Sequence, residues 1–351
     1  MVRMRAVAVL ALLWMAYPVR AYTPESGVWW NPAEPGTGIF IEIQDNFLVA
    51  AAYTYDLAGN AQWYTATGFL TGNALFDGVL DAFTGGNCPG CPYRPNREHL
   101  GAGGPIRIVF DANDPTRATL TWGGRTMPIQ RFPFYLKRPE DEQAMPGVRV
   151  ELTKMLGEWQ SVLDFTGNPN ADFQFYGDVV VLDLLTFDAQ GDFLEGCRPP
   201  DSLRGACSTQ DVARHRATLE YVASSGEQVL VVDNDAATFA AYFLKAGTDR
   251  FEGTVSVYPK GGTPQVFYPV RGFRTASRSF VQEGIGPSKQ EPAPQAAPRA
   301  LPAALFAPQA GKGVSKLLAP DHLAALHRAA ARLQAVTWGK AGGRDGGADS
   351  P

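Results

Sequence analysis

The first third of the chain alternates hydrophobic and polar residues in the way that is typical of β-strands. Ile39, Ile41 and Ile43 recur at every second position and therefore share one face of an extended segment. Residues Phe47–Tyr55 are apolar on both faces, and Gln62–Leu70 returns after a turn at 56–60. The turn contains a glycine, which adopts positive φ without steric cost. These features predict a strand followed by a hairpin.

Further segments of this kind follow at intervals of roughly ten residues, a spacing typical of all-β domains. In the first half they are Ala74–Phe83, Ile106–Phe110, Ala118–Trp122 and Met127–Tyr135, with a Gly/Pro/Cys-rich loop over 84–105. In the second half they are Val179–Phe187, Ala217–Val222, Val229–Val232, Thr238–Leu244, Gly253–Tyr258 and Gln265–Phe273. The pattern predicts an all-β protein built from antiparallel β-barrel or β-sandwich domains.

The two halves of the chain resemble each other. The Gly-x-Trp triplet at 27–29 recurs at 157–159, and the aromatic–Asp turn at 55–60 recurs at 187–192. The closing segments Gln130–Phe132 and Val270–Phe273 also correspond loosely. Self-similarity at a fixed offset indicates a duplicated unit, so we expect two related β domains.

Composition changes divide the chain into seven segments. The C-terminal part carries Leu323, Leu326, Ala330 and Leu333 at helical spacing, with Asp321 in the first turn. A Pro/Ala/Gln-rich stretch precedes it. The expected segments are a signal peptide (1–21), β domain 1 (22–136), a linker (137–150), β domain 2 (151–280), a disordered linker (281–315), a short amphipathic C-terminal helix (316–338) and a disordered tail (339–351).

The N-terminus has the pattern of a secretory signal peptide. Two arginines within Met1–Arg5 precede the apolar run Ala6–Ala16, and Val19-Arg20-Ala21 offers small residues for cleavage after Ala21. The apolar run is too short to cross a bilayer, which disfavours a membrane anchor. We therefore expect a secreted or periplasmic protein.

Charge is unevenly distributed. The whole chain has a net charge of −4, but residues 22–283 carry −11 and the rest of the chain from residue 284 carries +4. An acidic body repels nucleic acid and anionic membrane surfaces, so neither is expected as a partner. With 45% hydrophobic and only 19% charged residues, the chain as a whole is not disordered.

The four cysteines form two near pairs, Cys88/Cys91 and Cys197/Cys207. In an exported chain these pairs predict two local disulfides. Two alternatives stay open: a redox site at Cys-Pro-Gly-Cys, and a zinc site that needs all four thiolates to meet. We expect no metal and no cofactor.

The densest cluster of distinctive residues is Trp-Trp-Asn-Pro-Ala-Glu-Pro-Gly-Thr-Gly at 29–38. Adjacent tryptophans on a strand point to opposite faces, so one can fill the core while the other is exposed. A second double aromatic lies on the returning strand. The candidate ligand-binding residues are Trp29, Trp30, Asn31, Glu34, Tyr55, Trp63 and Tyr64.

This cluster resembles a repeat in secreted proteins of xanthomonad-like gammaproteobacteria. The repeat reads W-W-N-P-x-E-x-G-x-G, then Y-D-x-x-G, then W-Y, and it matches residues 29–38, 55–59 and 63–64. The resemblance covers residues 27–70 well and the rest of domain 1 loosely. It implies export and a β-rich module, and it implies no reaction.

Two interpretations of the aromatic residues compete. They either fill the barrel and close a hairpin, or they form an exposed binding face. Motifs for a nucleophile elbow, a phosphate loop or a zinc protease are absent from the sequence, and no catalytic residue is assigned. The sequence therefore favours a non-catalytic recognition protein that binds an extracellular polymer, peptide or protein. The alternatives are a small apolar-ligand carrier, a protease-inhibitor-like barrel and a secreted hydrolase that would gather Asp, Glu and His in one cleft.

Overall fold

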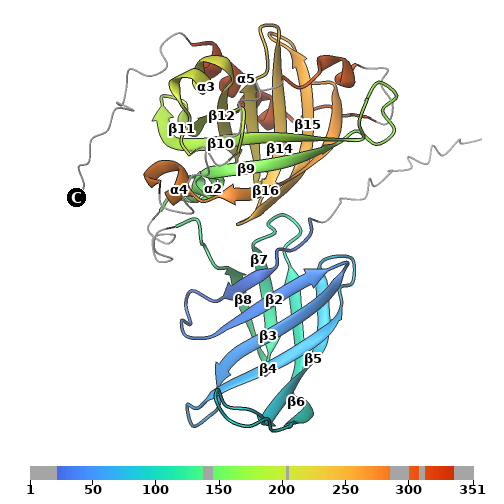
Figure 1. Cartoon of the computed structure of the whole chain (residues 1–351), viewed down its shortest axis with the longest axis vertical. Helices are drawn as coiled ribbons and strands as arrows, with labels where there is room; N and C mark the ends of the chain where they lie inside the picture. The colour runs from blue at the N-terminus through green and yellow to red at the C-terminus, as the bar shows by residue number, and fades with distance from the viewer. Residues whose placement is uncertain (1–21, 137–144, 203–204, 285–299, 308–312, 336–351) are drawn as a thin grey trace, which may run out of the picture.

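Two antiparallel β-barrels lie end to end in the computed structural model, which describes residues 22–136, 145–202, 205–284, 300–307 and 313–335 (Figure 1). Each barrel has eight strands, so the expected all-β class with two antiparallel domains is confirmed. The predicted signal peptide and the tail over 339–351 lie outside the described residues. The strands of barrel 1 are β1 (Gly27–Trp30), β2 (Gly38–Gln44), β3 (Phe47–Tyr55), β4 (Ala61–Phe69), β5 (Leu75–Gly85), β6 (Asn96–Phe110), β7 (Arg117–Trp122) and β8 (Arg125–Arg131).

Side-chain alternation explains the core of barrel 1. Ile39, Ile41 and Ile43 on β2 point inward and are buried, whereas Phe40 between them is exposed. Trp29 and further apolar side chains from the other strands meet these isoleucines inside the barrel. An eight-stranded barrel is just wide enough for side chains to fill it, and this interior is filled in that way.

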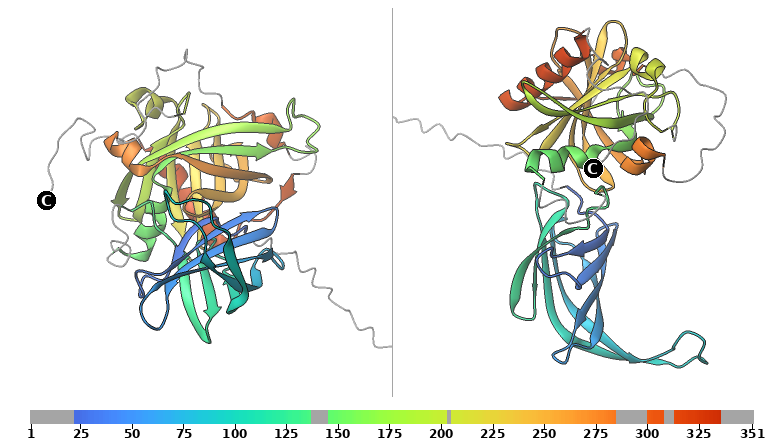
Figure 2. Two further views of the ribbon diagram at one scale, coloured as in Figure 1. Left: turned by 60° about the horizontal axis from the view of Figure 1, so that its bottom comes forward. Right: turned by 90° about the vertical axis from the view of Figure 1, so that its left-hand side faces the viewer.

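Strands β5 and β6 run beyond the barrel as a projecting hairpin arm, residues 83–100 (Figure 2). The predicted loop over 84–105 is therefore wrong for most of its length, because β5 continues to Gly85 and β6 begins at Asn96. The Gly-rich composition misled the prediction. Gly103 is needed where the backbone passes against Tyr64 and Leu80, since a Cβ atom there would collide with both.

Barrel 2 repeats the architecture with a different set of additions. It closes through the pairing of β15 with β16, and the two-residue strand β17 (Val314–Ser315) is added beside β16. Its strands are β9 (Gly157–Asp164), β10 (Phe175–Asp188), β11 (Gly191–Cys197), β12 (Arg216–Val222), β13 (Glu227–Asp233), β14 (Thr238–Ala246), β15 (Arg250–Pro259) and β16 (Val266–Ala276).

Segments that the sequence suggested were linkers complete the core of barrel 2. Helix α2 (Gly147–Met155) begins inside the predicted linker 137–150 and places Leu152 and Met155 in the core. Residues 300–307, which include the 3-10 turn η1 (Ala303–Phe306), lie inside the predicted disordered linker 281–315. That prediction is wrong for them, because their apolar side chains Leu301, Leu305 and Phe306 are buried in the same core.

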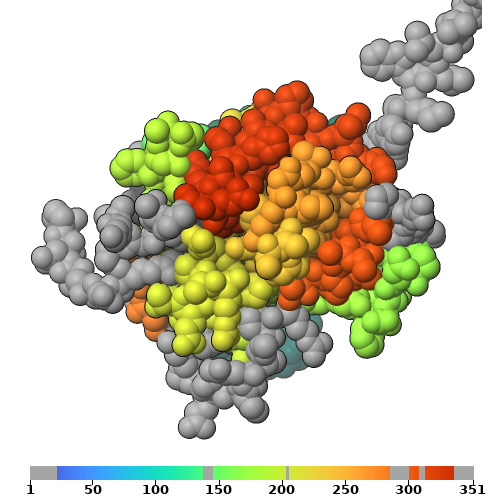
Figure 3. Space-filling view, turned by 90° about the horizontal axis from the view of Figure 1, so that it is seen from above, coloured from blue at the N-terminus to red at the C-terminus, as the bar shows by residue number. Residues whose placement is uncertain are grey.

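The predicted C-terminal helix is present as α5 (Pro320–Gln334), shorter than the expected 316–338. A proline at its first position and Asp321 in the first turn account for where it starts. Its apolar stripe, which includes Leu326 and Leu333, packs against outward side chains of barrel 2. Figure 3 shows the C-terminal segments in red on the surface of the molecule. None of the helices in the described residues is long and apolar enough to span a membrane.

In both barrels a tryptophan on the first strand pairs with an arginine on the last strand, a contact that we call the fastening. Its presence in both supports their descent from a duplicated unit. In barrel 1, Trp29 pairs with Arg131 across β1 and β8, and its Nε1 donates to the Glu25 carbonyl (3.1 Å). In barrel 2, Trp159 pairs with Arg274 across β9 and β16, and its Nε1 donates to the Met155 carbonyl (2.9 Å). The glycine two positions before each tryptophan has φ of +127° or +133°. A side chain at either glycine would collide with the fastening arginine.

This register corrects two sequence correspondences. The residue of barrel 2 that is equivalent to Arg131 is Arg274. The predicted alignment of segment 130–132 with 270–273 is therefore shifted by three residues. The turn at 55–60 joins the third and fourth strands of barrel 1, whereas the turn at 187–192 joins the second and third of barrel 2. These two turns are therefore not equivalent. Counting from the fastened first strands, β1 to β8 correspond to β9 to β16.

A buried carboxylate joins the two barrels. Glu25, just before β1, accepts hydrogen bonds from the backbone N–H groups of Thr248 (2.8 Å), Asp249 (3.0 Å) and Arg250 (3.1 Å) at the β14–β15 turn. It also pairs with Nε of Arg131 (3.2 Å), whose Nη2 reaches the carboxylate of Asp249 (2.8 Å). We call this set the Glu25 clamp.

Candidate functional site

The structure separates the seven residues that the sequence suggested for ligand binding. Trp29 is 0% exposed and packs against Phe110, so its predicted role in binding is wrong. Trp30 is half-buried against Phe132. Tyr64 points into barrel 1 and meets the ring of Trp122 at 5.4 Å. These side chains fill and close the barrel, as the structural interpretation of the motif expects.

Asn31 and Glu34 shape the turn between β1 and β2. The Asn31 side chain is buried, and its Oδ1 accepts from the Ala33 N–H (3.1 Å), the pattern of an Asx turn. The Glu34 carboxylate lies 2.6 Å from Nη2 of Arg125, where β8 begins. Both residues therefore have structural partners, and the Trp-Trp-Asn-Pro-x-Glu motif builds one end of the barrel.

Tyr55 and Trp63 are the two candidates that the structure exposes prominently, at 54% and 46%. They lie on the outer faces of β3 and β4, which stand side by side with β2 and β5 in Figure 1. Other aromatic and aliphatic side chains surround them on this face. We call the set the aromatic wall: Phe40, Phe47, Val49, Tyr53, Tyr55, Trp63, Phe69, Val79 and Phe83.

The register of the strands orders the wall into rows. Tyr53 lies directly opposite Trp63, and the ring of Trp63 stacks on that of Phe83 at 4.9 Å and 8° between planes. Phe47 lies opposite Phe69, with ring centroids 5.1 Å apart. Contiguous exposed apolar groups of this kind mark interaction sites on monomeric proteins. The sequence contains one indication of this exposed apolar surface, because the strand Phe47–Tyr55 is apolar at its outward positions as well as at its inward ones.

The aromatic wall carries only negative charge. Residues 22–93 include seven acidic residues and no Lys, Arg or His, and this stretch contains all of β1 to β5. Glu42, Asp77 and Asp81 lie on the strands of the wall. Asp77 has a partner in Arg107 of the neighbouring β6, at 3.6 Å, and this pair is exposed. The strands of the wall therefore carry carboxylates and no cation of their own, which favours partners that bring positive charge.

The cysteines pair within their own domains, as predicted. Cys88 and Cys91 are joined at the tip of the arm, with Cα atoms 5.3 Å apart. The other pair, Cys197 and Cys207, lies in barrel 2 with Cα atoms 5.9 Å apart. The two pairs do not converge, which argues against a four-thiolate zinc site. Within the described residues, no group of three or more His, Cys, Asp or Glu side chains is placed to hold a metal ion.

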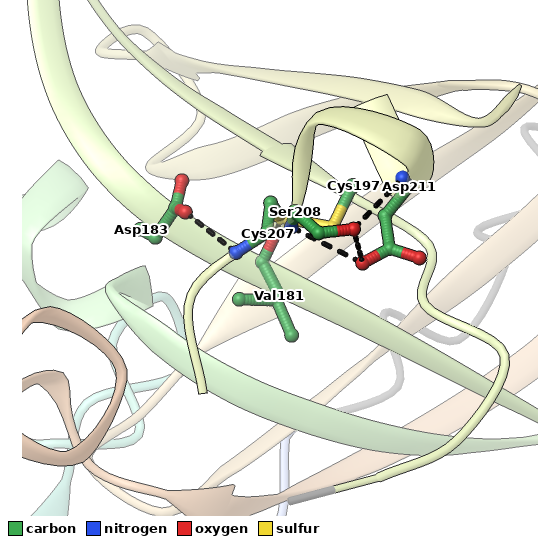
Figure 4. The surroundings of a disulfide bond; sticks show 6 residues. All are labelled: Val181, Asp183, Cys197, Cys207, Ser208 and Asp211. Carbon is green, nitrogen blue, oxygen red and sulfur yellow. Dashed lines mark hydrogen bonds between the residues drawn. A yellow bond between two sulfur atoms is a disulfide. The ribbon is translucent and has the colours of Figure 1, made fainter. Parts of the chain in front are cut away.

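The surroundings of the second disulfide show a structural role. Both sulfur-bearing residues are buried in a cluster with Val181 and Phe280, next to helices α3 (Thr209–Arg214) and α4 (Arg278–Glu283). Figure 4 shows the Cys207 N–H donating to Asp183 (2.9 Å) and a reciprocal capping box between Ser208 and Asp211 at the start of α3. The disulfide joins the end of β11 to Cys207, and the cap starts α3 directly after it.

A cleft of about 540 Å³ between the barrels gathers four carboxylates, those of Asp111, Asp114, Glu151 and Glu227. Nζ of the buried Lys154 lies 2.9 Å from Glu151 and 4.0 Å from Asp114. Burial opposes the charged form of Asp114, but the Lys154 ammonium and the Thr116 hydrogen bonds outweigh it and hold the pKa of Asp114 below its usual 3.8. Asp114 and Glu151 therefore hold the Lys154 ammonium between them and serve the contact between the barrels.

Asp114→Asn should lower the stability of the fold more at neutral pH than at acid pH. Because the folded pKa of Asp114 is lowered, its contribution to stability is complete above about pH 4 and is lost as the pH falls through the folded value. The difference in melting temperature between wild type and variant should thus be largest at pH 7 and shrink towards pH 3. Thermal melts across this range test it, with Asp45→Asn at an exposed turn as the control. A difference that is constant with pH would contradict the assignment.

The nearest approach to a catalytic set is Ser225, His322 and Glu227 at the rim of this cleft. Nε2 of His322 lies 3.1 Å from Oγ of Ser225 and 2.5 Å from Oε2 of Glu227. A triad needs the nucleophile and the acid on opposite ring nitrogens, because the acid orients the ring while the other nitrogen takes the proton. Here one nitrogen contacts both groups, so the geometry does not support a serine-type triad at these residues.

No protein-family model matches the chain, and no match was found among curated proteins or solved structures.

Proposed function

We propose that this is an exported recognition protein that binds a polypeptide partner through the aromatic wall of barrel 1. The observation that carries the proposal is the row of exposed Tyr53 and Trp63, with the half-buried Phe83 stacked on Trp63, on the outer faces of three adjacent strands. Rigid aromatic side chains supply much contact area at low cost in conformational entropy, and they dominate binding energy at protein interfaces.

Ring orientation favours a polypeptide over a carbohydrate. Trp63 and Phe83 stack face to face, and Tyr53 stands opposite Trp63 on its other side. Sugar rings bind by lying on a free aromatic face, whereas apolar side chains pack equally well against ring edges. Phe83 covers one face of the Trp63 ring, and the wall adds aliphatic groups such as Val49 and Val79, which suit apolar side chains of a partner.

Export belongs to the same proposal. The pattern of residues 1–21 and the resemblance of residues 27–70 to a secreted repeat both support it. Two disulfides are in keeping with an oxidising compartment.

The alternative functions have weaker support. Both barrel interiors are filled by side chains, which argues against a carrier of small apolar ligands. A protease-inhibitor role rests on the barrel architecture alone, and architecture does not determine function.

A displayed library of random peptides, selected on the immobilised full chain, tests the proposal. Selected peptides should bind the Tyr53→Ala/Trp63→Ala variant at least about tenfold more weakly, because truncation of central aromatic residues removes most of an interface's affinity. Fluorescence anisotropy measures the affinities, and circular dichroism checks that the variant is folded. In parallel, an oligosaccharide array tests whether the chain binds carbohydrate.

Phe187→Ala is the matched control, since Phe187 is 72% exposed on barrel 2 and lies outside the wall. It should leave binding unchanged. If the selected peptides bind the wall variant as tightly as wild type, or if only oligosaccharides bind, the proposal is wrong.

A further inference from the structure

Because the two barrels are equivalent, barrel 2 shows what can cover the corresponding outer face of barrel 1. Counting from the fastened strands, β4 and β5 of the aromatic wall correspond to β12 and β13 of barrel 2. In barrel 2 the outer face of β12 and β13 is the place where α5 packs, on the side shown in Figure 3. The same position is therefore covered in one barrel and uncovered in the described part of the other.

The surface of barrel 2 that α5 covers, here called its seat, makes both apolar contacts and ion pairs with the helix. Leu326, Ala329 and Leu333 of α5 pack against the outward side chains of β12 to β14. On the flank of this stripe, Arg328 donates to Glu220 (2.6 Å to Oε2), and Arg332 reaches both Glu220 and Asp188. The Arg332 guanidinium also lies 4.0 Å from the ring centroid of Phe193. An amphipathic helix with basic residues thus fits an apolar, acidic and aromatic sheet face.

The aromatic wall has the same chemistry without the helix. Trp63 and Phe69 on β4 and Val79 on β5 are exposed where the counterpart in barrel 2 is covered. The carboxylates of Asp77 and Asp81 lie on β5. Asp77 has an exposed pair with Arg107 of β6, and residues 22–93 themselves contain no basic side chain. A guanidinium placed here would find both carboxylates and ring faces.

We propose that the aromatic wall binds a basic amphipathic α-helix of another protein, in the way that barrel 2 binds its own α5. This inference rests on the proposed function and names the class of its partner. The dimensions agree, since the 15-residue α5 is about 22 Å long and the nine-residue strands β3 and β4 are about 30 Å long. The partner presents an apolar stripe at i, i+3, i+4 and i+7, with Arg or Lys beside it.

A synthetic peptide of residues 317–335, labelled with fluorescein, is the probe. It carries the stripe and both arginines of α5, and it is titrated against the full chain at low and high salt. We expect saturable binding that weakens with salt and at least about tenfold weaker binding by the Arg328→Glu/Arg332→Glu peptide. A scrambled peptide of the same composition should bind equally weakly, because it lacks the stripe.

Two wall variants connect this binding to barrel 1. Trp63→Ala/Phe69→Ala removes rings, and Thr67→Lys adds a cation at an exposed position of β4 while leaving every ring in place. Each should weaken binding of the peptide at least about tenfold. If the peptide binds both variants as tightly as wild type, it occupies the seat on barrel 2 and the inference is overturned.

The peptide library separates this inference from the proposed function. If its binders depend on the wall but are neither basic nor helical by circular dichroism, the helix proposal fails and the recognition function stands. If neither the library peptides nor the 317–335 peptide depends on the wall, both proposals fail. Wall-dependent library binders that are basic and helical support both.

Discussion

Arg198→Met should lower the free energy of unfolding by about 3–5 kcal/mol, the usual cost of removing one partner from a buried ion pair. Arg198 is 2% exposed inside barrel 2, and its Nε lies 2.8 Å from Oδ1 of Asp178. Its other nitrogens donate to Asn234 (3.0 Å), Asp178 (3.0 Å) and the Tyr242 hydroxyl (3.2 Å). Burial disfavours the charged guanidinium, but Asp178 outweighs it and the pKa of Arg198 is raised. Without Arg198, the carboxylate of Asp178 stays buried beside Tyr242 with no cation.

Urea unfolding followed by tryptophan fluorescence measures the loss. The double variant Arg198→Met/Asp178→Leu should recover most of it, because an apolar pair replaces a buried ion pair at little cost. Arg271→Met is the control on the same barrel, since that guanidinium is exposed, 3.9 Å from Glu252, and should matter little. A single variant as stable as wild type, or a double variant less stable than the single, would contradict this account.

Glu25→Gln should uncouple the barrels. A glutamine amide has one acceptor oxygen where the clamp needs several, and its NH₂ group would face backbone N–H groups. Of its two carboxylate partners, the buried Arg131 would then keep Asp249, whose side chain is half exposed. We expect a loss of about 3–5 kcal/mol from the contact between the barrels. The single calorimetric transition expected for the wild type should then split into two.

Glu34→Gln is the matched control, because it breaks an exposed pair with Arg125 within barrel 1. It should leave a single transition near the wild-type temperature. Small-angle scattering gives a second measure, since uncoupled barrels have a larger radius of gyration. A single transition at an unchanged midpoint for Glu25→Gln would show that other contacts hold the barrels together.

The fold class could be predicted from those strands that bury one face and expose the other. Ile39, Ile41 and Ile43 belong to such a strand, and β3 occupies the predicted Phe47–Tyr55. Strand β11 was missed because Gly191–Cys197 mixes charged, aromatic and glycine residues without a clear period. Residues 300–307 were missed because their proline and alanine content resembles a linker, and Phe306 is buried only through contact with distant aromatic residues such as Phe165 and Tyr268.

The candidate site was half predicted, and the missing half depended on registers that the sequence does not contain. Alternation shows that Trp29 and Trp30 face opposite ways but not which one faces inward. Phe83 belongs to the wall because β5 pairs with β4 in a register that brings it against Trp63. The partner of Glu34 is Arg125, 91 residues further along the chain. Such contacts become visible only when the barrel closes.

The Glu25 clamp also has a consequence for the order of folding. Its hydrogen bonds join residues separated by 223 to 225 positions, whereas each barrel is assembled from hairpins between neighbouring strands. Contacts of such high sequence separation close late, because the entropy of the intervening loop is lost before they form. The first strand of barrel 1 thus acquires its last partners only after the β14–β15 turn exists. We therefore expect docking of the two barrels to be the final step of folding, with the Glu25 carboxylate hydrated until then.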